Sequence, residues 1–168
     1  MSRIRVRDPL PQLVAMARAV ASQTQPADIF AALERATAEC LGHKLFTVML
    51  YHAETGESER FYTNQPDAYP VGGRKALNPT FWTEQVLRRH QPFLGRTAAD
   101  IRAVFFDHER IAALGCHSVI NLPVAEGGQV LGTINLLHEE NWYDDDDLVL
   151  GAIFAGLAVP VYRRLTAR

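Results

Sequence analysis

Apolar positions along the first forty residues recur with the spacing of helices. Residues 10–21 contain one apolar stripe, and residues 27–41 contain a second after a break at Gln25-Pro26. A repeat of three and four residues places such side chains on one face of a helix, and Gly42 follows the second stripe as a stop signal. We therefore expect two amphipathic helices at the start of the chain.

The period then changes to two, which is the spacing of strands. Residues 45–52 and 58–64 are rich in β-prone residues and are separated by a turn of sequence ETGE. Residues 65–78, QPDAYPVGGRKALN, contain two prolines and two glycines, which favours a loop. The pattern predicts two strands joined by a short turn, followed by an irregular segment.

Short helices are expected next. One should run from Asn78, as its N-cap, to His90, with a proline in its first turn. After a short extended piece, a further helical stretch should start at Thr97 or Asp100 and end at Gly115. Together these residues form a long excursion between the two parts of the sheet.

Residues 115–137, GCHSVINLPVAEGGQVLGTINLL, predict a second hairpin. A two-residue loop at the paired glycines would mix polar and apolar side chains on both faces. A three-residue loop at 126–128 instead pairs Asn121 with Thr133 and keeps one face apolar. Because the buried pattern fixes the register, we expect the three-residue loop.

The two faces of this sheet then differ. One is apolar throughout, whereas the other mixes apolar residues with short, uncharged hydrogen-bonding groups. A solvent-exposed face normally contains Lys, Glu and Arg, so we favour a partly polar cavity covered by residues 72–114. The alternatives are a bare surface and a polar core that satisfies its own hydrogen bonds. The mixed face should contain His117, Asn121, Thr133 and Asn135, with Thr47, Met49 and Tyr51 beside them.

The order of elements is two helices, two strands, the excursion, two or more strands and a last helix, which predicts an α+β fold with an antiparallel sheet. The last helix begins at DDDD, which suits the positive end of a helix dipole. It is apolar almost all round, so one side can cover the sheet and another requires the first helix or a second copy of the chain. We expect a homodimer through the first and last helices, with residues 1–25 as an N-terminal dimerisation element and 26–168 as the domain.

Composition narrows the functional classes. The chain has 168 residues and a net charge of −2, which fits one domain and argues against a nucleic-acid partner. We expect no signal peptide and no membrane span, since Pro160 should interrupt the longest apolar stretch. Two cysteines without a CxxC pattern fit a reducing cytoplasm. The arginines at positions 3, 5 and 7 should form a mobile end.

Three segments resemble the GAF domain family: LFTVMLYHAETGESERFY, FFDHERIAALG and ALGCHSVINLPVAEGGQVLGTINLLHEENWYDDDDL. The resemblance covers residues 26–168. It implies a central antiparallel sheet of about six strands, with terminal helices on one face and a ligand pocket under loops and short helices on the other. It also implies sensing by small-molecule binding and dimerisation through the terminal helices. From the mixed face we expect a non-enzymatic sensor of a small polar or planar metabolite, whose output is a downstream partner protein, a rearrangement of the dimer or chemistry of its own.

Candidate ligand-binding residues come from the mixed face and its cover: Tyr51, Trp82, Phe106, His108, His117, Asn121, Thr133 and Asn135. No histidine pair has a metal-site spacing, so no metal is expected. The Cys116-His117 pair lies at a strand start, whereas bilin-binding GAF domains have it upstream, so no covalent tetrapyrrole is expected. Two alternatives stay open: a thiol-dependent reductase of free methionine sulfoxide, and a pure dimerisation module whose cavity is filled by side chains.

Overall fold

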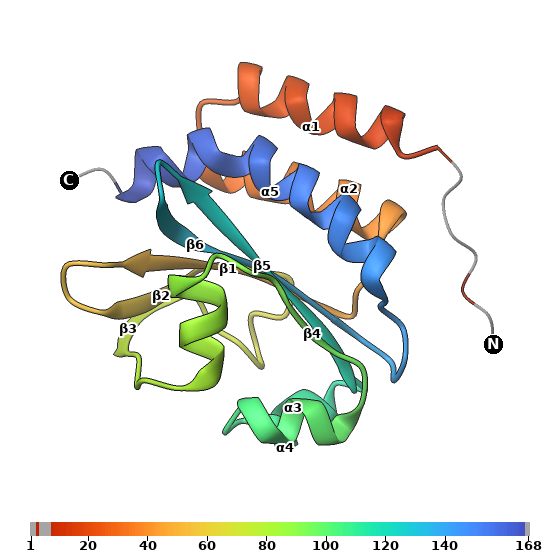
Figure 1. The fold of residues 1–168 in the computed structure, drawn as a ribbon. Coiled ribbons are helices and arrows are strands. Elements are labelled where there is room, and N and C mark those ends of the chain that lie inside the picture. The colour runs from red at the N-terminus through yellow and green to blue at the C-terminus, as the bar shows by residue number, and fades with distance from the viewer. Residues whose placement is uncertain (1–2, 4–7, 167–168) are drawn as a thin grey trace.

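Six antiparallel strands form the centre of the fold, in the order β3-β2-β1-β6-β5-β4. The structure is a computed structural model that describes residue 3 and residues 8–166. Figure 1 shows helices on both sides of the sheet. The strands are β1 (Leu45–His52), β2 (Glu57–Thr63), β3 (Gly72–Ala76), β4 (Phe93–Gly95), β5 (Ser118–Glu126) and β6 (Gln129–His138). The expected α+β fold with about six strands is confirmed.

The apolar face of the sheet lies under two helices, α2 (Pro26–Cys40) and α5 (Asp145–Thr166). A third helix, α1 (Leu10–Ser22), packs on α2 and α5 and forms an outer layer (Figure 1). The core between these layers joins even-numbered residues of β1, β5 and β6 to the buried sides of the helices, for example Val48, Ile120 and Ile134 with Phe30 and Phe154. Burial of this surface is the main term that stabilises the fold.

Pro160 does not interrupt the last helix, contrary to the expectation from sequence. It lies inside α5, which continues to Thr166. Ala158, Val161 and Tyr162 are fully buried around it, so tertiary packing holds both sides of the proline in helical conformation and overrides its local cost. By length and composition α5 could cross a membrane, but its buried side chains belong to the core of the domain.

Short helices cover the second face of the sheet (Figure 1). These are η1, a π-helix (Thr83–Arg88), α3 (Ala98–Val104) and α4 (His108–Ala113). The single helical stretch expected before Gly115 is two helices, because Phe105 has an extended backbone. The expected cap at Asn78 is also wrong, since the helical segment starts at Phe81 and the Thr80 hydroxyl accepts the backbone N–H of Thr83.

An edge strand lies within the segment that the sequence predicts as a loop. Residues 72–76 form β3, where Lys75 pairs with Ser58 and Arg74 with Glu59 of β2. Neither glycines nor exposed charged residues favour a strand on their own. The backbone of β2 provides the hydrogen-bonding partner that the local sequence does not reveal.

The β5–β6 hairpin has a different register from the one expected. Glu126 pairs with Gln129 across a two-residue turn, and a bulge between Val124 and Ala125 shifts the pairing so that Asn121 lies opposite Asn135. The expected three-residue loop is therefore wrong. A bulge adds one residue to one strand, so the two-residue turn and the bulge together leave the same side chains on each face.

The N-terminal segment is attached to the domain at Arg3. Its guanidinium pairs with the buried carboxylate of Asp147 at 2.8 Å and lies over the ring of Trp142. The expectation of a mobile end is therefore wrong for Arg3, because a buried ion pair holds it. Arg5 and Arg7 lie outside the described residues.

Candidate functional site

A cavity of about 400 Å³ lies between the mixed face of the sheet and its cover. Its floor comes from odd-numbered residues of β1, β5 and β6, and its cover from η1, α3, α4 and the segment that includes β3. Ligand pockets commonly have volumes of ~300–1,000 Å³, so a small metabolite fits. The floor residues are Thr47, Met49, Tyr51, Val119, Asn121, Thr133, Asn135 and Leu137.

Two asparagines form the polar centre of the floor. Asn121 and Asn135 lie directly opposite each other, and the Asn121 Nδ2 donates to Asn135 Oδ1 at 2.7 Å. Asn135 Nδ2 in turn donates to the Thr47 hydroxyl at 3.1 Å on the next strand. Such cross-strand pairs stabilise a sheet, and they satisfy amides that are almost fully buried. The polar groups in these strands therefore form a connected row across three strands.

The cover is joined to this row by Trp82, which directly precedes η1. The indole Nε1 donates to Asn121 Oδ1 at 3.0 Å. The π-helix that follows has wider turns than an α-helix, with the backbone N–H of Arg89 bonded to the carbonyl of Glu84. Single π-helical turns are rare and frequent at functional sites. The asparagine row and the segment that leads into η1 are thus joined by a direct hydrogen bond.

The structure brings together six of the eight residues predicted from sequence. Those that line the cavity are Tyr51, Trp82, Phe106, Asn121, Thr133 and Asn135. Phe106 lies at the rim and is 86% exposed. Contact of these six residues with a ligand stays a prediction.

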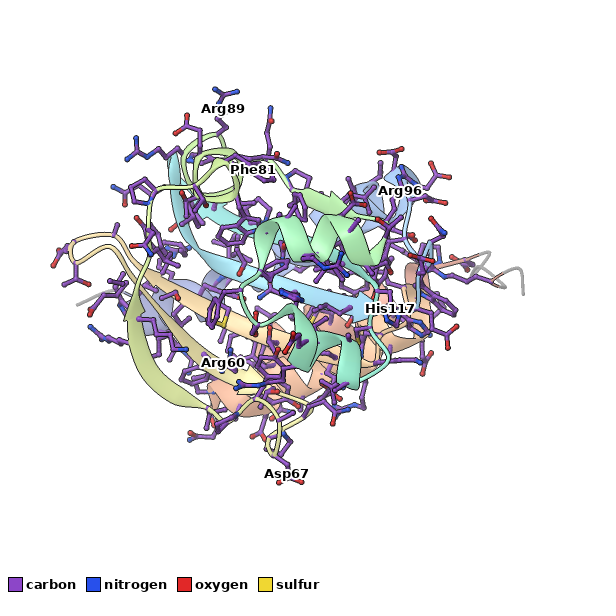
Figure 2. All side chains as sticks on the ribbon, turned by 90° about the horizontal axis from the view of Figure 1, so that it is seen from below. Arg60, Asp67, Phe81, Arg89, Arg96 and His117 are labelled. Atoms are coloured by element: carbon purple, nitrogen blue, oxygen red, sulfur yellow. The ribbon has the colours of Figure 1, made fainter. Side chains whose placement is uncertain are left out.

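His108 and His117 are not among the lining residues. His108 is the first residue of α4. His117 precedes β5, where its backbone N–H bonds to the carbonyl of His138, and Figure 2 shows it on the side of this face away from β3. Alternation along β5 correctly predicted the face of residues inside the strand. It does not determine the direction of the His117 side chain, because His117 lies before the strand begins.

Charged residues at one end of the cavity were not among the predicted site residues. Arg60 of β2, Lys75 of β3 and Arg110 of α4 line it, together with the carboxylate of Asp107. The ring of Tyr69 contacts both arginines, with the guanidinium carbons of Arg60 and Arg110 at 4.8 and 5.5 Å from its centroid. Tyr69 donates its hydroxyl to Asp107 at 2.6 Å, and burial raises the pKa of this phenol well above its usual value.

A register shift explains why Arg60 faces the cavity. Val48 pairs with Tyr62, but the next residue, Met49, pairs with Arg60, so Phe61 is an extra residue in β2. Phe61 and Tyr62 both contact Phe30 on the helix side. Without the bulge, alternation from Tyr62 would place Arg60 on that apolar side as well. The sequence gives no direct signal for the bulge.

Neither cysteine is available for chemistry in the cavity. Cys40 belongs to the core under the helices and Cys116 to the cluster on the other side of the sheet, and neither lines the cavity. Burial raises the pKa of Cys116 to about 11 and also raises that of Cys40. Since the thiolate is the reactive form, this arrangement does not favour a thiol-dependent reductase.

Solved structures with the same fold include domains of a phosphotransferase and of a phytochrome, and a reductase. The GAF domain of an Acinetobacter phosphoenolpyruvate-protein phosphotransferase is 14% identical, with a TM-score of 0.73 and 96% of each chain covered. The phycocyanobilin-bound GAF domain of a cyanobacterial phytochrome is 14% identical, with a TM-score of 0.69 and 96% of each chain covered. Free methionine-R-sulfoxide reductase of Neisseria meningitidis, in complex with its substrate, is 12% identical, with a TM-score of 0.66, and the match covers 99% of this chain and 97% of that one.

At these identities the likeness shows the fold alone. A comparison with curated protein sequences gives no match. The family model for the GAF domain, however, matches residues 23–160, which is most of the chain. The topology, the cavity on the mixed face and this match agree, and the chain belongs to the GAF domain family.

Proposed function

We propose that this GAF domain is a sensor that binds a small metabolite in the cavity on the mixed face of its sheet. The observation that supports this most is the cavity of about 400 Å³ above a row of hydrogen-bonded amides. A self-satisfied polar core would need no such space. A module whose cavity is filled by side chains would lack it.

The comparisons are consistent with binding but do not identify the ligand. Two similar GAF folds, those of the cyanobacterial phytochrome and of the Neisseria reductase, were solved with a bound chromophore and a bound substrate, respectively. In this chain the asparagines each retain free hydrogen-bonding capacity, since a side-chain amide has two N–H donors and two acceptor lone pairs. A ligand with a complementary polar group can therefore bind without breaking the row.

The connection between Trp82 and Asn121 gives a route from the ligand to the cover. A ligand that contacts the amide row changes the preferred position of the indole, and with it η1. Such a shift requires that the ligand bind one position of the cover more tightly than another. A downstream protein would recognise the altered surface of the cover or of a dimer.

Binding can be measured through the fluorescence of Trp82. The chain has two tryptophans, and the other, Trp142, packs against Gly42 outside the cavity. In a Trp142→Phe variant, a metabolite panel should include a compound that raises Tm and changes Trp82 emission with the same saturation curve. A stabiliser that leaves Trp82 emission unchanged would place its site elsewhere.

Two asparagine substitutions separate the cavity from the rest of the fold. Asn135→Leu should abolish the ligand-induced shift in Tm. Asn64→Leu is the matched control, because Asn64 bonds to the backbone of Phe46 and Lys44 and does not line the cavity. It should lower stability but keep the ligand-induced shift. Equal shifts in both variants would contradict the proposed site.

A further inference from the structure

The charged residues of the cavity do not balance one another. Arg60, Lys75 and Arg110 face a single carboxylate, that of Asp107. Within the described part of the chain, none of the three cations forms an ion pair. The neighbouring Arg74 differs, since its guanidinium approaches Glu57 and Glu59 at 3.9 and 3.5 Å. Lys75 and Arg110 are exposed residues and Arg60 is half-buried, so this part of the cavity wall has an excess of positive charge that extends to its opening.

Arg60 has an unused hydrogen-bonding edge. Its Nη1 donates to the carbonyl of Pro70 at 3.2 Å, and its planar group lies on Tyr69. Its Nε is buried and has no hydrogen-bond partner among the described residues. Burial also lowers the pKa of Arg60. A buried donor without an acceptor is unfavourable, so a ligand that offers an acceptor to Arg60 would relieve this cost.

The Nε side of a guanidinium can bind a carboxylate through two parallel hydrogen bonds. The contacts to Pro70 and Tyr69 hold Arg60 in place, so little rotamer freedom remains to be lost on binding. Arg110 lies beside the same Tyr69 ring and adds a second positive charge. Asp107 is close by and accepts the Tyr69 hydroxyl, so its negative charge disfavours a dianion such as a phosphate monoester.

The rest of the cavity wall is suited to a flat apolar group. Apolar and aromatic side chains line the cavity above the asparagine row, namely Leu45, Trp82, Leu87, Phe105, Val119 and Leu137. Aromatic rings pack favourably against such surfaces. Phe81 lies on the segment that leads into η1. Figure 2 shows Arg60 and Phe81 at opposite ends of this face.

We propose that the metabolite bound in this cavity is an aromatic monocarboxylate, whose carboxylate binds Arg60 and Arg110 and whose ring lies beside Trp82. This inference rests on the proposed sensory function and specifies its ligand class. It assigns Arg60 as the residue that determines specificity for an anion.

The test uses charged probes and their neutral isosteres on the full chain with Trp142→Phe. Benzoate, phenylacetate and trans-cinnamate are titrated against Trp82 emission, each beside its primary amide, with acetate and inorganic phosphate as further probes. At least one aromatic carboxylate should saturate the signal about tenfold or more below the concentration its amide needs, since a charged hydrogen-bonded pair contributes ~1.5–3 kcal/mol.

Arg60→Gln should remove the preference for carboxylate over amide, and Arg60→Lys should retain part of it, because lysine keeps the charge but loses the two-point geometry. Arg74→Gln is the matched control on the adjacent strand and should leave the preference unchanged. Circular dichroism and urea unfolding of each variant show whether it is folded. A folded Arg60→Gln protein that keeps the full preference would overturn the assignment.

The outcomes separate the ligand class from the sensory function. Equal affinity for amides and carboxylates, or binding of phosphate but of no aromatic carboxylate, overturns the ligand class. If in addition a different metabolite saturates Trp82 emission, the sensory proposal stands without it. If neither these probes nor the metabolite panel changes Trp82 emission, both proposals fail.

Discussion

The hydrogen bond between Asn121 and Asn135 can be measured by a double-mutant cycle. Asn135→Ala removes the acceptor of Asn121 Nδ2 and the donor to Thr47. Each lost bond between neutral groups costs ~0.5–1.5 kcal/mol, and a buried group left without a partner costs ~1–3 kcal/mol. We therefore expect Asn135→Ala to lower the free energy of unfolding by about 2–3 kcal/mol.

Asn121→Ala should cost a similar amount, because it removes the same bond and the acceptor of the Trp82 indole. In the double variant the shared bond is lost only once and neither asparagine remains to be left unsatisfied. The sum of the two single losses of unfolding free energy should therefore exceed the loss in the double variant by about 1 kcal/mol or more. This difference, the coupling energy, has this sign because the hydrogen bond between the two amides is counted in both single variants but lost only once in the double variant.

Urea unfolding followed by circular dichroism gives each free energy from the midpoint and the slope m. Asn121→Ala with Ser118→Ala is the control cycle, because Ser118 lies on the other face of β5 and donates to the carbonyl of Glu139. Its effects should add within ~0.5 kcal/mol. If the effects of the two single substitutions in the Asn121–Asn135 cycle also added within ~0.5 kcal/mol, the interpretation of these residues as one hydrogen-bonded row would be refuted.

Three further predictions concern packing, pH and assembly. Gly132→Ala should destabilise the fold by about 3 kcal/mol, because its Cβ would lie 2.0 Å from a backbone oxygen of β1. Gly156→Ala is the control, since its Cβ would lie in open space, and it should stabilise the fold by ~0.5–1 kcal/mol. Urea unfolding measures both changes. Burial lowers the pKa of His138 from 6.5 to about 4, so the folded state favours its neutral form. The free energy of unfolding should therefore fall as the pH decreases from about 6.5 to about 4. Tm against pH should show a weaker fall in His138→Phe, and an equal fall would contradict this cause. The predicted homodimer should dissociate in Ile153→Glu, which changes an exposed residue beside exposed Val149 on α5, and light scattering that finds the parent chain monomeric would refute it.

Alternation along the strands was sufficient to place the amides on one face. Asn121, Thr133 and Asn135 share the cavity floor as predicted, although the expected hairpin loop was wrong. The reason is that the two-residue turn and the bulge at Val124/Ala125 together shift the register by an even number of residues from the expected one. A shift of this kind changes which residues are opposite but not which face they occupy.

The cationic end of the cavity was beyond what the local pattern could reveal. Arg60 faces the cavity because of a bulge in β2, and Arg110 arrives from a short helix whose separation from α3 was not expected. Lys75 was assigned to a loop rather than to an edge strand. Each of these positions depends on contacts with another segment of the chain or on a bulge that has no recognisable sequence signature.

The sequence by itself determined the terminal helices, the central strands, the α+β layout and the two different faces of the sheet, because periodicity depends on residues a few positions apart. Only the tertiary structure decided which side chains meet. Trp82 bonds to Asn121 across 39 residues and Asn135 to Thr47 across 88, and the two arginines converge on Tyr69 from different elements. Such contacts follow from bulges, strand order and the docking of the cover, which are set by the packing of the whole chain rather than by neighbouring residues.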